Sequence, residues 1–147
     1  MKKFPNFKLK LISGIEIESS AIKKTVLFFY PKAFTSGCTI ELCDFQSSFN
    51  KFKKIDIQLV GVSKDLIEKN IKFASKYKIK YQLASDETDV CEKLGIWIEK
   101  SMYGKKYYGI GRTTFLIDSK GKIFKRWNNV KVAGHVKEVL EIAKKCP

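Results

Sequence analysis

Two short apolar runs on either side of an amphipathic segment constrain the fold of this chain most strongly. Residues 25–30 (TVLFFY) form a β-branched and aromatic run that ends at Pro31, and residues 57–62 form a second run. Runs of this length are typical of strands buried on both faces of a sheet. Between them, residues 38–54 predict one amphipathic helix. The three elements therefore predict two parallel strands joined by a right-handed helical crossover.

Other patterns predict antiparallel strands. Apolar and polar residues alternate on either side of the turn dipeptide Ser13-Gly14, which predicts an N-terminal β-hairpin. Residues 113–117 and 122–127 flank a turn at residues 118–121, and they predict a second antiparallel hairpin. Residues 81–84 predict one further short strand.

Three more helices complete the predicted fold. Asp65 and Glu68 form a capping-box pattern before a helix with an apolar inner side, made of Leu66, Ile67, Ile71, Phe73, Ala74 and Tyr77. Residues 87–94 predict a short helix, and a last helix carries Val136, Val139, Leu140 and Ala143 on one face. These elements predict an α/β, thioredoxin-like fold with a mixed central β-sheet flanked by helices and an N-terminal β-hairpin, in a single domain over residues 1–147.

Composition limits the kinds of partner to expect. The formal net charge is +14, but only Arg112 and Arg126 are arginine, and the lysines form no long run. Dispersed lysine is typical of a solvated coat rather than of a base-reading surface, so we expect no nucleic-acid partner. Self-repulsion of this charge favours a monomer over a dimer. No export signal and no membrane-spanning apolar run is visible, which predicts a cytoplasmic protein without a membrane partner.

The most informative segment is residues 28–45, FFYPKAFTSGCTIELCDF, because it sets Cys38 where a buried strand gives way to a helix. Free backbone N–H groups and the helix dipole stabilise a thiolate at such a position, and they lower the pKa of such cysteines from about 8.5 into the range of about 3.5–7.5. Thr35 or Ser36 is expected to cap the helix. The segment therefore predicts a reactive thiol.

Cys43 lies five positions after Cys38. In an ideal helix this spacing separates the two Cα atoms by about 8.7 Å, whereas a disulfide needs about 7 Å or less. The pair can be bridged only when the first turns of the helix melt. The spacing predicts a cycle in which Cys38 attacks an oxidant and becomes a sulfenic acid, the helix opens, and Cys43 condenses with it to form a disulfide that an external thiol reduces.

Several motifs in one order resemble a known family. Pro31, Thr35 and Cys38 stand in the P-x-x-x-T-x-x-C spacing of peroxiredoxins. GCTIELCDF at residues 37–45 and GIGRTTFLID at residues 109–118 resemble the peroxiredoxin Q or bacterioferritin comigratory protein (BCP) subgroup. Shorter stretches extend the likeness over nearly the whole chain: GVSKD (61–65), KFASKY (72–77), LASDET (83–88), SMYGKKY (101–107) and VAGHVKEVL (132–140).

The resemblance implies a thiol-dependent peroxidase that reduces hydrogen peroxide and organic hydroperoxides in antioxidant defence. Cys38 then corresponds to the peroxidatic cysteine, and Cys43 corresponds to the resolving cysteine on the same helix. The implied reductant is thioredoxin or a similar dithiol protein. Attack of a thiolate on an O–O bond needs hydrogen-bond donors and a cation, so neither a metal nor an organic cofactor is expected.

Four further residues acquire roles from the same likeness. Thr35 resembles the hydroxyl that bonds the peroxide, and Pro31 resembles the residue that shields the pocket. Arg112 resembles the guanidinium group beside the thiolate, a role for which a lysine is a poor substitute. Glu41, about one helical turn after Cys38, would orient Arg112. Ser36, Asn6 and Gly111 depart from the residues common in the family, which leaves the pocket shape and the preferred peroxide open.

Other interpretations of the same residues remain open at this point. Cys38, Cys43, Cys91 and His135 could be counted as zinc ligands, but a four-residue gap inside a helix splays two sulfurs apart. Arg112 could be a surface salt-bridge partner. Cys91 is expected to be packed in the core, Cys146 to be frayed, and His135 to lie at the surface or cap the last helix.

Two other functions compete with the peroxidase. A disulfide oxidoreductase on the same fold is the first, although that chemistry normally uses two cysteines separated by two residues rather than four. A lysine-rich nucleic-acid-binding module is the second, and it would show a steep dependence of binding on salt.

Overall fold

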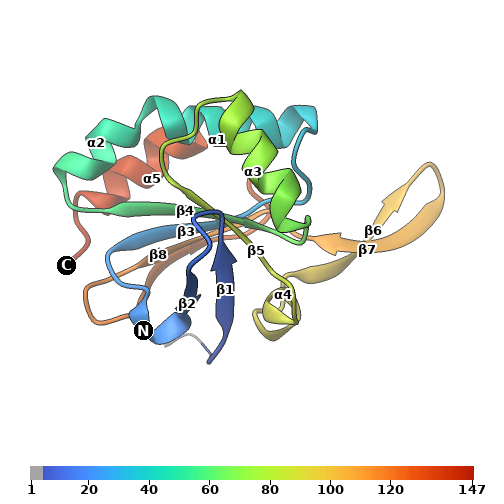
Figure 1. Ribbon diagram of the computed structural model, residues 1–147, viewed down its shortest axis with the longest axis horizontal. Coiled ribbons are helices and arrows are strands. Elements are labelled where there is room, and N and C mark those ends of the chain that lie inside the picture. The colour runs from blue at the N-terminus through green and yellow to red at the C-terminus, as the bar shows by residue number, and fades with distance from the viewer. Residues whose placement is uncertain (1–4) are drawn as a thin grey trace.

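A computed structural model describes residues 5–147. Within these residues, a seven-stranded sheet in the order β2-β1-β5-β4-β3-β8-β9 forms the centre of the molecule (Figure 1). Its strands are β1 (Lys8–Leu11), β2 (Glu16–Glu18), β3 (Thr25–Phe29), β4 (Gln58–Ser63), β5 (Gln82–Ser85), β8 (Thr113–Ile117) and β9 (Ile123–Trp127). Strands β3, β4 and β5 are parallel, whereas the remaining neighbours pair antiparallel. The predicted mixed sheet and both predicted hairpins are confirmed.

Helices cover both faces of this sheet (Figure 1). One face carries α1 (Ser36–Ser47), α2 (Phe49–Lys54), α3 (Ile67–Lys76) and α5 (His135–Ala143). The other face carries α4 (Val90–Lys93), and a short 3-10 helix (Ser19–Ala21) precedes β3. Alternate residues of β3 enter the two cores, as expected for a strand buried on both sides. None of the helices formed by residues 5–147 is long and apolar enough to cross a bilayer.

The prediction of one helix over residues 38–54 is wrong, because the segment forms two helices that meet at Ser48. Ser48 has φ −100° and ψ 6°, outside the helical region. Just before it, the Ser47 hydroxyl donates to the carbonyl oxygen of Cys43 at 3.0 Å. Serine side chains that bond back to the preceding turn bend helices. The break ends α1 four residues after Cys43.

The capping box predicted at Asp65 is also wrong. Leu66 is the N-cap residue of α3, and no side chain caps this helix. Asp65 Oδ2 instead accepts hydrogen bonds from the Ala33 backbone N–H at 2.8 Å and from the Ser63 hydroxyl at 2.9 Å. This carboxylate therefore ties the loop before α1 to the end of β4.

The inner side of α3 differs from the predicted one. Leu66 and Ile71 are 76% and 44% exposed, whereas Asn70 is fully buried. The Asn70 side chain accepts from the Tyr30 hydroxyl at 2.6 Å and donates to the Ser63 and Ser85 hydroxyl oxygens. A buried amide is stable when its hydrogen bonds are satisfied, and here it joins α3 to the ends of three strands.

Two expectations at the C-terminal part are wrong, since His135 and Cys146 are both buried. His135 Nε2 lies 2.8 Å from Thr114 Oγ1, and its ring contacts those of Phe45 and Trp127 edge-on. Burial lowers the pKa of His135 to about 4. Cys146 packs in the core between the sheet and helices α1, α2, α3 and α5. Cys91 is buried in the core on the α4 side, as predicted.

The sequence did not predict a separate hairpin made of β6 (Trp97–Met102) and β7 (Lys105–Ile110). It projects from the body of the molecule (Figure 1). Its turn residues Tyr103 and Gly104 both have positive φ, 53° and 79°. Such values at both central positions characterise the type I′ turn of two-residue hairpins.

Candidate active site

Cys38 is the third residue of α1, the helix that follows β3. The first backbone hydrogen bond of the helix runs from the Thr39 N–H to the Thr35 carbonyl oxygen. Cys38 is 1% exposed and has a free thiol, whereas Phe34, Thr35 and Ser36 before it are exposed. The sulfur is therefore buried near the N-terminus of a helix, where backbone N–H groups favour negative charge.

The side chain of Arg112, which directly precedes β8, contacts this sulfur although the two residues are 74 positions apart in the sequence. Its Nη2 lies 3.5 Å from Cys38 Sγ, and its Nη1 donates to Glu41 Oε1 at 2.7 Å. A Cβ atom at Gly37 would come within 3.3 Å of Nη2, so glycine leaves the room that the guanidinium group needs. Burial favours a lower pKa for Arg112, but the charges of Glu41 and Cys38 outweigh it and raise the pKa. Arg112 is thus not a surface salt-bridge partner.

Glu41 holds the guanidinium group from inside the protein. Its side chain is fully buried on α1, and one oxygen, Oε2, has no hydrogen-bond partner in the described part of the chain. Burial raises the pKa of Glu41 to about 7, although Arg112 acts in the opposite direction. The pair fixes the guanidinium plane so that its second nitrogen faces Cys38.

Thr35 is the N-cap residue of α1, but its side chain does not cap the helix. The hydroxyl donates instead to the Lys32 carbonyl oxygen at 2.7 Å. This corrects the expectation of a side-chain cap. Pro31 precedes this loop and is half-buried. Thr35 and Pro31 therefore both belong to the segment that connects β3 to α1.

Cys43 lies on the same unbroken helix as Cys38. It is half-buried, and burial together with the neighbouring charge of Asp44 raises the pKa of its thiol. At neutral pH Cys43 is therefore protonated, which suits a thiol that reacts after Cys38 rather than first.

Tyr81 contacts α1, and no pattern in the sequence predicted this contact. Its hydroxyl donates to the Leu42 carbonyl oxygen at 2.7 Å, and its side chain is buried. It lies just before β5, 39 residues from Leu42, and no local pattern marks it. The bond holds α1 between the two cysteines.

Replacing Tyr81 by phenylalanine is expected to loosen α1. Loss of one buried hydrogen bond lowers the free energy of unfolding by about 1 kcal/mol, and it eases the opening that a disulfide between the cysteines needs. Urea unfolding measures the first effect. Rapid alkylation and mass spectrometry after one equivalent of peroxide measure the second, as faster disulfide formation. Tyr108→Phe, on the exposed hairpin, is the control. Equal rates in the two variants would contradict this role.

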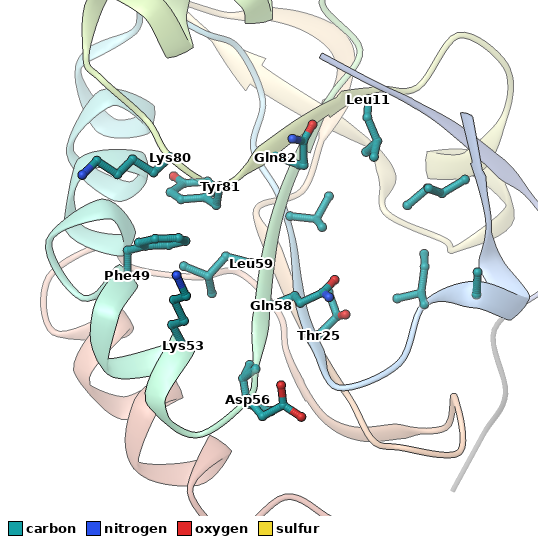
Figure 2. A pocket seen from close by; sticks show the side chains of 15 residues that line it. Leu11, Thr25, Phe49, Lys53, Asp56, Gln58, Leu59, Lys80, Tyr81 and Gln82 are labelled. Carbon is teal, nitrogen blue, oxygen red and sulfur yellow. The ribbon is translucent and has the colours of Figure 1, made fainter. Parts of the chain in front are cut away.

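A cavity of about 490 Å³ lies elsewhere, between α2, β4 and the N-terminal hairpin (Figure 2). Its walls include Phe49, Leu59 and Tyr81 and do not include Cys38. Thr25, the first residue of β3, lines this cavity, whereas Cys38 follows the last one. The cavity and the reactive sulfur are therefore at opposite ends of the strand.

The zinc interpretation has no cluster of ligands to support it. Across residues 5–147, no three His, Cys, Asp or Glu side chains gather as a metal site. Cys38 is buried on the face of the sheet that carries α1, whereas Cys91 is buried on the opposite face, which carries α4.

Sequence comparison identifies relatives over nearly the whole chain. The family model described as the AhpC/TSA family matches residues 1–126. A peroxiredoxin Bcp from Bacillus subtilis is 42% identical over 146 residues, which are 97% of this chain and 93% of the relative. A peroxiredoxin Bcp from Escherichia coli is 38% identical over 139 residues, or 92% of this chain and 89% of the relative.

Solved structures agree with this likeness. The bacterioferritin comigratory protein of Xanthomonas campestris, studied for its alkyl peroxide reduction activity, matches with a TM-score of 0.88 and 35% identity over 95% of this chain and 90% of that one. The peroxidoxin BcpB of Mycobacterium tuberculosis matches with a TM-score of 0.84 and 30% identity over 98% and 95%. The predicted thioredoxin-like fold is confirmed.

Proposed function

Because this chain belongs to the AhpC/TSA family, we propose that Cys38 is the cysteine that reacts with peroxide. The chain is a peroxiredoxin, a thiol-dependent peroxidase whose oxidised cysteine is restored by a thioredoxin-type reductant. One observation carries the assignment to Cys38, namely the contact of its sulfur with Arg112 Nη2 at 3.5 Å. Burial raises the pKa of each of the other three thiols, Cys43, Cys91 and Cys146, which disfavours their thiolates.

In the proposed first step, the Cys38 thiolate attacks one oxygen of a hydroperoxide. An S–O bond forms, the O–O bond breaks, and the other oxygen leaves with the electron pair and takes up a proton. Arg112 lies beside the sulfur, where it stabilises the thiolate and the leaving oxygen, and Glu41 keeps it there. Hydrogen peroxide and organic hydroperoxides both fit this chemistry.

We propose that peroxide reaches the sulfur through the loop before α1. Cys38 is 1% exposed in this structure, whereas Phe34, Thr35 and Ser36, which precede it in the chain, are exposed. We assign to Thr35 the hydroxyl that bonds the peroxide and to Pro31 the shielding of the pocket. The Thr35 hydroxyl would rotate from the Lys32 carbonyl oxygen toward the bound peroxide.

In the proposed second step, α1 opens and Cys43 condenses with the Cys38 sulfenic acid. An S–S bond forms and water leaves. A dithiol protein then reduces the disulfide and becomes oxidised itself, and we propose thioredoxin for this part. The four free thiols fit a reducing compartment such as the cytoplasm, and the net charge of +14 favours a monomer.

Replacement of Cys43 by serine tests this cycle. The variant is expected to reduce one peroxide per chain and then stop, because no second thiol on α1 forms the disulfide that thioredoxin reduces. The measurement is peroxide consumed per chain in the presence of thioredoxin, thioredoxin reductase and NADPH. Mass spectrometry of the unmutated protein should find the disulfide between Cys38 and Cys43.

The matched control is Cys91→Ser, at a buried cysteine on the other side of the sheet. It should keep turning over peroxide. Sustained turnover by Cys43→Ser, with loss of turnover in Cys91→Ser, would contradict the proposal and place the resolving role at Cys91.

A further inference from the structure

The peptide group between Lys32 and Ala33, in the segment that connects β3 to α1, is held on both of its sides. Its N–H group donates to Asp65 Oδ2 at 2.8 Å, and its carbonyl oxygen accepts from the Thr35 hydroxyl at 2.7 Å. A peptide group is planar, so fixing the direction of its N–H also fixes the direction of its carbonyl oxygen. Asp65 therefore sets the position of the group to which the Thr35 hydroxyl bonds.

The Asp65 carboxylate is itself fixed in place. Its side chain is 9% exposed, and Oδ2 also accepts from the Ser63 hydroxyl at 2.9 Å. The Ser63 oxygen in turn accepts from Asn70 Nδ2 at 3.1 Å. The other carboxylate oxygen, Oδ1, lies 3.5 Å from Lys69 Nζ. A carboxylate with both oxygens engaged has little freedom to turn, so its bond to Ala33 is a fixed point for the loop before α1.

The loop that Asp65 holds carries a strained residue. Phe34, between Ala33 and Thr35, has φ 67°, in the left-handed region that bulky residues rarely adopt. Such a conformation persists only where the surrounding contacts over-determine it. Here the contacts are the Asp65 hydrogen bond and the Phe34 ring, whose centroid lies 5.2 Å from that of Phe73 on α3. Without Asp65, the backbone at Phe34 is expected to relax and to displace Thr35.

We propose that Asp65 is a positioning residue for peroxide reduction, which acts on Thr35 through the peptide group between Lys32 and Ala33. This role rests on the proposed function, in which Cys38 attacks the peroxide and the Thr35 hydroxyl bonds it. Asp65 acts through the backbone rather than on the reacting atoms. It keeps the Thr35 oxygen in one place at the N-terminus of α1, so the peroxide meets a group that is already in position. Such pre-positioning contributes strongly to reaction rates.

Asp65→Ala is expected to lower the rate constant for hydrogen peroxide at pH 7 about ten- to a hundredfold, because the loop loses its acceptor and Thr35 is displaced. Stopped flow measures this rate. Asp65→Asn keeps an oxygen that can accept from the Ala33 N–H, so its rate should stay within about twofold of the unmutated protein. This rescue separates a hydrogen-bonding role from a role of the charge, since asparagine no longer forms an ion pair with Lys69.

Hydrogen exchange of the Ala33 amide tests the contact without any substitution. The N–H is bonded to a buried carboxylate, so it should be protected from exchange in the unmutated protein and in Asp65→Asn. NMR spectroscopy measures the exchange rate of this single amide. Exchange at the rate of an unprotected amide in the unmutated protein would overturn the role of Asp65, even if Asp65→Ala failed to fold.

Asp118→Ala is the matched control. Asp118 is also a buried aspartate, and its Oδ1 accepts from two backbone N–H groups at 2.9 Å. Because β8 is antiparallel to β3, Asp118, which follows β8, lies near the start of β3, whereas Cys38 follows the end of β3. Urea unfolding should show a loss of stability in both alanine variants, and only Asp65→Ala should slow peroxide reduction.

A normal rate in Asp65→Ala would overturn the role of Asp65. So would equal slowing in Asp118→Ala, or an Asp65→Asn rate as low as that of Asp65→Ala. Mass spectrometry locates the sulfenic acid in the unmutated protein. Oxidation at a cysteine other than Cys38 would overturn the proposed function together with the role of Asp65, whereas oxidation at Cys38 with any of these outcomes would overturn the role of Asp65 alone.

Discussion

Cys38→Ser is expected to reduce peroxide consumption by about a thousandfold or more. In the proposed mechanism the Cys38 thiolate is the nucleophile, and a serine hydroxyl at this position stays protonated at neutral pH. The fold should survive, because an oxygen in place of the sulfur can still accept from Arg112 Nη2, which lies 3.5 Å from Cys38 Sγ. Peroxide consumption with the thioredoxin system measures the loss, and urea unfolding verifies that the protein remains folded.

Cys146→Ser supplies the comparison for this experiment, because Cys146 is also buried but contacts the Ile117 carbonyl oxygen rather than Arg112. Its activity should match that of the unmutated protein. If Cys38→Ser consumed peroxide normally and Cys146→Ser did not, the reactive sulfur would be at the C-terminal end of the chain instead.

Arg112→Lys is expected to slow peroxide reduction about a hundredfold. The guanidinium group makes two directed contacts, with Glu41 Oε1 at 2.7 Å and with Cys38 Sγ at 3.5 Å. An ammonium group keeps the charge but lacks the planar fork that reaches both partners. Stopped-flow measurement of the rate constant for hydrogen peroxide at neutral pH tests this prediction. The free energy of unfolding should change little, because a positive charge remains to pair with Glu41.

Arg126→Lys is the appropriate control for this change, since Arg126 is the other arginine of the chain. Its Nε donates to Asn128 Oδ1 at 2.7 Å in an exposed position on β9. The variant should keep the full rate. An Arg112→Lys rate equal to that of Arg126→Lys would remove the catalytic role of Arg112 and leave it as a partner of Glu41.

The parts of the fold that were predictable from sequence are those whose residues are buried on one or both sides. Strand β3 is a continuous β-branched and aromatic run, β4 has an apolar centre, and α5 carries its apolar residues at helical spacing, so their burial is visible in the pattern itself. The β6–β7 hairpin was missed because most of its residues are exposed and give no such alternation. Asn70 was missed because a buried polar residue is recognised only once its partners are known.

For the site, the sequence alone predicted that Cys38 lies in the first turn of a helix after a buried strand and that Cys43 lies on the same helix. Both facts follow from local propensities and spacing. Only the packing of distant segments shows that Arg112, 74 residues from Cys38, contacts the sulfur and that Glu41 holds the guanidinium group in place. The physical reason is that helix formation and the helix dipole act within a few residues, whereas charge compensation depends on which distant segments pack together.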